Sequence, residues 1–116
     1  MLVPEAAVRH VGSVAIVDLS GRITMGIGCT VVREAVRELV NAGRRNILLN
    51  LQDVTYVDSS GLGEMAGLSV TVAKLGGHLK LLHAQPGVDT LLQTTRLCLL
   101  LDAFHDETEA LRSFEP

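Results

Sequence analysis

The sequence predicts an α/β domain in which strands alternate with helices. Residues 46–51, NILLNL, form an almost unbroken apolar run, which is typical of a central strand covered on both faces. Segments 30–42 and 62–73 instead place apolar residues three and four positions apart, the spacing of a helix with one buried face. The connections are too short for independent units, which favours a sheet with parallel crossovers. At 116 residues, the chain has the length of a single domain, residues 1–116.

The N-terminal part of the chain predicts a hairpin and then the first helix. Residues 6–21 read as two short strands joined at Gly12-Ser13, since β-forming residues flank that dipeptide. The helix that follows should end at Gly43, where a left-handed conformation causes no Cβ clash. After the central strand, Asp53 indicates a turn.

The C-terminal part predicts four further elements after the second helix, which should end at Gly76-Gly77. The last helix should begin at Asp106, because Asp106 and Glu109 have the spacing of a cap and its partner. In order, the elements are a strand at 78–84, a short helix at 88–94, a short strand at 101–105 and a helix reaching 111–114.

Composition excludes several classes of function. The net charge of -3 and an aromatic content of 3% give neither a basic field nor a stacking platform for nucleic acid. We expect no membrane association, because the start lacks the pattern of a signal peptide and no apolar run approaches the roughly 20 residues of a span. The prediction is a soluble, cytoplasmic protein. Cys29 and Cys98 are interpreted as buried reduced thiols, since they fit neither a disulfide framework nor a zinc site.

No cofactor and no metal are expected. The run KLGGHLK lacks the order of a nucleotide-binding phosphate loop. The histidines are not spaced as a metal set and are interpreted as surface or strand-edge residues: His10, His78, His83 and His105.

The stretch VTYVDSSGLGEMAG, residues 54–67, places a carboxylate and two hydroxyls where a strand should turn into a helix. A catalytic serine is the first reading, but a nucleophile elbow needs glycines two residues before and after the serine. Val57 precedes Ser59 by two residues and Asp58 precedes Ser60 by two, so neither serine fits. We therefore expect no enzyme activity.

Two other readings of the motif remain. Ser60 can cap the second helix by accepting from the free N–H groups of its first turn. Ser59 is then a spare hydroxyl, and Gly61 and Gly63 leave room for another protein to approach. A phosphate on Ser59 would add about -1.5 to -2 charges. It would face a helix N-terminus that favours anions, although Asp58 would repel it. The motif is thus a polar cap or a modifiable switch.

The chain resembles the STAS domain, found in anti-sigma factor antagonists and at the cytoplasmic end of sulfate transporters. The core of the likeness is ILLNLQDVTYVDSSGLGEMAG followed by KLGGHLKLLHA, with VAIVDLSGRI before it and VDTLLQTTRLCLLLDAFHDETEAL after it. The resemblance spans essentially the whole chain. It implies a small mixed sheet with helices packed mainly on one face.

The resemblance also implies a mechanism of partner switching. In the antagonists, the serine after the motif's Asp is phosphorylated by an anti-sigma factor that is itself a serine kinase of the GHKL type. Unphosphorylated antagonist binds this kinase, phosphorylation breaks the complex, and a phosphatase resets it. Carried onto this chain, the phosphoacceptor is Ser59, with Ser60 as second choice. The implied partner-binding residues are Thr24, Met25, Asp58, Ser59, Ser60, Gly61, Leu62 and Gly63.

The chain departs from the antagonists in one loop. After the first conserved strand, many antagonists read Gly-x-Leu-Asp, whereas this chain reads GRIT and carries Thr24 in place of the acid. Met25 and Ile27 follow in a glycine-rich loop and are either an apolar contact for a partner or ordinary packing over the helix end. An alternative function therefore stays open, that of an unphosphorylated STAS scaffold in a signalling or transport complex.

Overall fold

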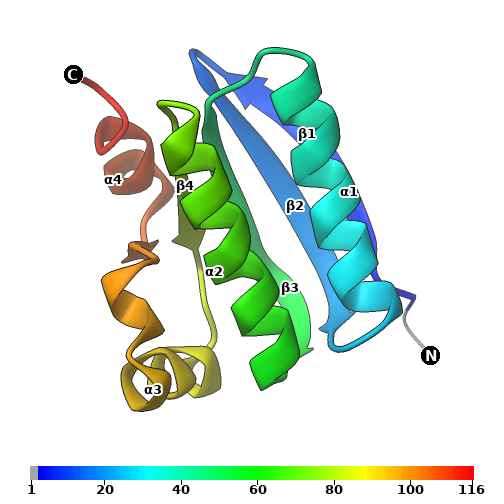
Figure 1. Ribbon diagram of the computed structural model, residues 1–116. Helices are drawn as coiled ribbons and strands as arrows, with labels where there is room; N and C mark the ends of the chain where they lie inside the picture. Colours follow the sequence, from blue (N-terminus) through cyan, green and yellow to red (C-terminus); the bar gives the residue numbers. More distant parts are fainter. Residues whose placement is uncertain (1–2) are drawn as a thin grey trace.

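The computed structural model describes residues 3–116 and contains one five-stranded sheet in the order β1-β2-β3-β4-β5 (Figure 1). β1 is antiparallel to β2, and the other neighbouring strands are parallel, so the predicted mixed sheet is confirmed. The strands are β1 (Glu5–Val11), β2 (Val14–Ile23), β3 (Asn46–Val57), β4 (His78–Leu82) and β5 (Ala103–Phe104). The helices are α1 (Ile27–Asn41), α2 (Ser59–Lys74), α3 (Pro86–Thr95), the 3-10 turn η1 (Leu97–Leu99) and α4 (Glu107–Arg112).

Most predicted elements are present, with shifted ends. The hairpin turns at Gly12-Ser13 as expected, and α1 starts at Ile27, ahead of the predicted residue 30. Gly43 follows α1 with a φ of 88°, which confirms its place as the left-handed residue after the helix. The α4 cap is Asp106, whose carboxylate accepts from Thr108 N at 3.1 Å.

The predicted turn at Asp53 is wrong, because β3 continues to Val57. The strand stays paired with β2 throughout, and Ser20 lies opposite Asp53. Two shifts of register absorb the extra residues of β3, one before Asp53 and one after Val54. Pairing with a long neighbouring strand thus overrides the local turn propensity of Asp53.

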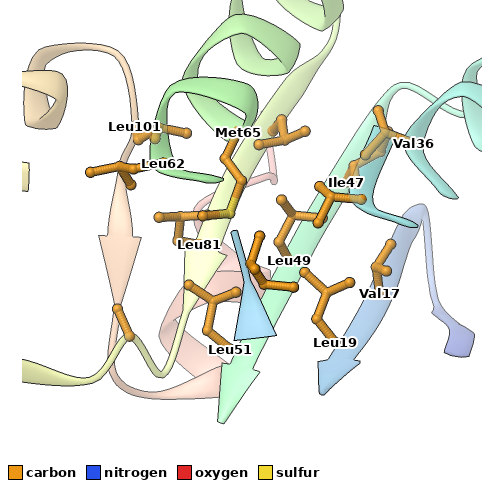
Figure 2. Close-up of a cluster of buried hydrophobic side chains, with 14 of the residues drawn as sticks. Val17, Leu19, Val36, Ile47, Leu49, Leu51, Leu62, Met65, Leu81 and Leu101 are labelled. Carbon is orange, nitrogen blue, oxygen red and sulfur yellow. The ribbon is translucent and has the colours of Figure 1, made fainter. Parts of the chain in front are cut away.

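The main core lies between the sheet and helices α1, α2 and α3. Ile47, Leu49 and Leu51 point from β3 into this layer, where Val36 of α1 and Met65 of α2 meet them (Figure 2). All three β3 side chains are fully buried. The predicted packing of helices mainly on one face is therefore confirmed.

The opposite face of the sheet is covered in part by α4. Leu48 points to this side and packs with Phe114 and Ala110. Lys80 is buried beneath the helix, donates to the carbonyl and hydroxyl oxygens of Ser113 at 3.0 Å, and lies 4.6 Å from the centre of the Phe114 ring. The apolar run of β3, residues 46–51, is thus covered on both faces, as predicted.

Within residues 3–116, none of the helices combines the length and the apolar character needed to cross a membrane.

Candidate functional site

The parallel pairing of β2 with β3 brings two loops together at one end of the sheet. Ile23, the last residue of β2, lies opposite Val57, the last residue of β3. The chain then enters α1 through residues 24–26 and α2 through Asp58, so both helices start at the same end of the sheet (Figure 1). The serine motif and the glycine-rich loop, far apart in sequence, therefore form one surface.

Asp58 caps α2. Its backbone is extended, with φ -90° and ψ 179°, and its carboxylate Oδ1 accepts from Gly61 N at 2.7 Å. The prediction that Ser60 caps the helix is wrong, because the helix already begins at Ser59 and Ser60 lies inside its first turn. A carboxylate in the cap position suits the positive end of the helix dipole.

The capping role leads to a stability prediction. We expect Asp58→Ala to lower the free energy of unfolding by about 1–2 kcal/mol, because the Gly61 N–H loses its partner. Ser60→Ala, which removes no cap, should change it by less than about 0.5 kcal/mol. Urea denaturation of the two variants measures both values. A larger loss in Ser60→Ala than in Asp58→Ala would contradict the assignment of the cap.

The second carboxylate oxygen of Asp58 binds the neighbouring loop. Oδ2 accepts from Met25 N at 3.2 Å, and Asp58 N donates to Ile23 O at 3.4 Å. One half-buried side chain thus connects the start of α2 to the loop that follows β2.

Two glycines allow the helix ends to approach β2 closely. A Cβ on Gly28 of α1 would lie 2.5 Å from Arg22 O, and a Cβ on Gly61 of α2 would lie 2.9 Å from the Ile23 carbonyl carbon and overlap its oxygen. Gly61 and Leu62, two of the predicted partner-binding residues, are buried in the isolated chain. Gly61 is buried by this close approach to β2, whereas Leu62 is buried in the main core.

The other predicted residues lie at or near the surface. Ser59 and Gly63 are exposed, whereas Thr24 and Ser60 are half-buried. Met25 and Ile27 have exposed fractions of 77% and 68%, so the interpretation of these two side chains as ordinary packing over the helix end is wrong. The exposed hydroxyl of Ser59 therefore shares a surface with two uncovered apolar side chains.

An ion pair that sequence reasoning missed joins the two helices beside this surface. Arg33 of α1 donates to Glu64 of α2 through two bonds, Nη2 to Oε1 at 2.6 Å and Nε to Oε2 at 3.3 Å. The two residues lie 31 positions apart, so only their shared place on adjacent helices could have indicated the contact. The bidentate pair fixes α1 against α2 next to the site.

The cysteines are both free thiols. Cys29 is buried near the site, and burial together with the nearby carboxylates of Glu64 and Asp58 raises the pKa of its thiol. Cys98 is only half-buried, which corrects the prediction for this residue. Across residues 3–116, no three His, Cys, Asp or Glu side chains lie close enough together to hold a metal ion.

A hollow of about 860 Å³ adjoins the site, and sequence reasoning missed it as well. It forms because β4 pairs with β3 only as far as Asn50, which leaves residues 51–57 of β3 with a free edge facing the start of α3. Gln85 and Gln52 both line the hollow, and Gln85 Nε2 donates to Gln52 O at 3.3 Å. The sequence predicted a turn at Asp53, so it gave no sign that β3 continues to Val57 with a free edge.

Comparison with known proteins identifies similar chains. Residues 5–110 match the family model of the STAS domain. The chain is 27% identical over 111 residues to the anti-sigma F factor antagonist of Paenibacillus polymyxa, an alignment that covers 96% of this chain and 95% of the relative. It is 34% identical over 86 residues to the anti-sigma-B factor antagonist of Bacillus subtilis (strain 168), covering 74% of this chain and 77% of that protein.

Solved structures show the same fold. The anti-sigma factor antagonist SpoIIAA in its unphosphorylated form superimposes with a TM-score of 0.69 at 20% identity, over 93% of this chain and 96% of its own. The Bacillus cell fate determinant SpoIIAA in the phosphorylated form gives a TM-score of 0.71 at 19% identity, over 95% and 99% of the two chains.

Proposed function

This chain belongs to the STAS domain family and to its anti-sigma factor antagonists, and we propose that it acts by partner switching, as a binding protein and not as an enzyme. In the unphosphorylated state it binds an anti-sigma factor, and phosphorylation of Ser59 releases that partner. The partner is itself a serine kinase of the GHKL type, and a phosphatase restores the hydroxyl. In the kinase reaction, the γ-phosphoryl group of ATP passes to Ser59 Oγ, and ADP and a proton are released.

The observation that carries this proposal is the exposed hydroxyl of Ser59 beside exposed apolar side chains. Ser59 is exposed at the first position of α2, whereas Ser60 is half-buried, which favours Ser59 as the acceptor. Met25 and Ile27 offer the apolar contact area that a partner needs. A phosphate placed in such an interface would be a desolvated dianion, which costs affinity unless a basic group receives it.

A second candidate function is a scaffold module whose Ser59 is never modified. Thr24 favours it, because this half-buried residue stands where many antagonists carry an acid near the phosphorylation site. The scaffold would use the same apolar surface but would not respond to ATP.

Affinity capture from a lysate of the source organism, followed by incubation with ATP, tests the proposal. We expect a wild-type bait to retain an ATP-binding protein, to acquire one phosphate on Ser59 and then to release that protein. Ser59→Ala should retain the same protein and stay unmodified, and Ser60→Ala should behave as wild type. Mass spectrometry identifies the retained protein and detects the phosphate on Ser59. A stable complex with unmodified Ser59 in the presence of ATP would support the scaffold.

A further inference from the structure

We propose that Asp58 is a positioning residue that couples the state of Ser59 to the shape of the apolar loop, residues 24–27. In this coupling, a phosphate on Ser59 displaces the Asp58 carboxylate, and the loop that carries Met25 and Ile27 loses its anchor. The inference rests on the phosphorylation of Ser59 proposed above. Under this inference, phosphorylation changes both the charge at Ser59 and the conformation of the apolar loop on the proposed partner surface.

The first argument is that the two carboxylate oxygens of Asp58 bind different segments of the chain. Oδ1 accepts from Gly61 N at 2.7 Å and Oδ2 accepts from Met25 N at 3.2 Å, so a single side chain holds two segments that are far apart in sequence. Asp58 directly precedes Ser59. A change at Ser59 thus occurs one residue away from the group that anchors the loop.

The second argument is the weak support of the loop on its other side. α1 starts after Gly26, which has a φ of 97° and provides no side-chain cap. The helix holds the loop through Cys29 N to Thr24 O and Thr30 N to Gly26 O, both at 3.1 Å. Neither bond involves Met25, whose N–H donates to Asp58. Loss of the carboxylate therefore releases the residue with the most exposed apolar side chain of the loop.

The third argument is competition for the same donors. A phosphate at the first position of a helix faces the free N–H groups of the first turn, which favour a dianion over a monoanion. Asp58 uses one of these groups, Gly61 N, and carries charge of the same sign. Because the two anions repel at close range, the phosphate and the Asp58 carboxylate do not both stay bound at the N-terminus of α2. Once Asp58 turns away, the Met25 N–H faces water.

Hydrogen exchange measured by NMR on the isolated protein tests the coupling without any partner. We expect phosphoserine incorporated at position 59 to speed exchange of the Met25 amide by about tenfold, the effect of losing a hydrogen bond to a charged acceptor. Asp58→Ala should speed it equally without phosphate, and phosphoserine in the Asp58→Ala background should add nothing. The amide of Leu49, in the buried centre of β3, serves as the control for global unfolding.

The possible outcomes separate this inference from the proposed function. Unchanged exchange at Met25 in the phosphoserine protein would overturn the coupling, even if ATP still releases the captured partner. Additive effects of phosphoserine and Asp58→Ala would also overturn it, because they would show that the phosphate acts on the loop by another route. The coupling is supported if phosphoserine speeds exchange of the Met25 amide and leaves exchange of the Leu49 amide unchanged. In the Asp58→Ala background, phosphoserine should then have no further effect on the Met25 amide.

Discussion

Gly61→Ala is expected to destabilise the protein by about 3 kcal/mol, at the upper end of the range for an overpacked core position. The added Cβ would overlap Ile23 O and lie 3.1 Å from Ile23 Cγ2. The overlapped atom belongs to the backbone of a paired strand, so no flexible side chain can move aside. The start of α2 would have to withdraw from β2, and this movement would also stretch the bond from Asp58 to Gly61 N. Thermal and urea denaturation measure the loss.

Gly63→Ala is the matched control on the same helix. A Cβ on Gly63 would meet nothing within 4 Å, and the residue is exposed. Alanine there should stabilise the protein by about 0.5–1 kcal/mol, because glycine is a poor residue for a helix interior. Opposite signs at two positions of one helix would show that close packing, not helix propensity, requires Gly61. A loss of similar size in both variants would contradict this explanation.

The periodicity of the sequence predicted the architecture because each buried layer repeats a pattern. Residues 46–51 alternate between two covered faces of the sheet, and α2 presents Leu62, Met65 and Ala66 to one of them. Such patterns reflect which side chains are buried, and the spacing of apolar residues in the sequence shows this directly. The mixed sheet and its parallel crossovers follow from the order of the elements.

The atomic roles in the site were not predictable in the same way. Asp58, Ser59 and Ser60 all have side chains that can cap a helix, so composition alone does not decide which one does. The choice is made by the position where the helix starts, and the first turn of that helix packs through Gly61 against Ile23 of a different strand. The anchor from Asp58 to Met25 spans 33 positions and has no local signal.

Ser59→Asp is expected to weaken binding of the captured anti-sigma factor by about 100-fold or more, equivalent to about 2.7 kcal/mol. The substitution places a second carboxylate beside Asp58 on the proposed partner surface, where an unpaired charge would lose its water on binding. Stability should stay within about 1 kcal/mol of wild type, because the position is exposed. Isothermal titration calorimetry with the purified partner measures the affinity.

Two variants separate a local charge effect from other causes. Ser59→Asn has nearly the same shape as Ser59→Asp without the charge, so it should bind within about threefold of wild type. Thr71→Asp adds the same charge to an exposed position of α2, about 18 Å further along the helix, and should also bind normally. Equal losses for Ser59→Asp and Thr71→Asp would attribute the effect to net charge. Wild-type binding by Ser59→Asp would show that charge at Ser59 does not control the partner, and the scaffold would then be the better account of this surface.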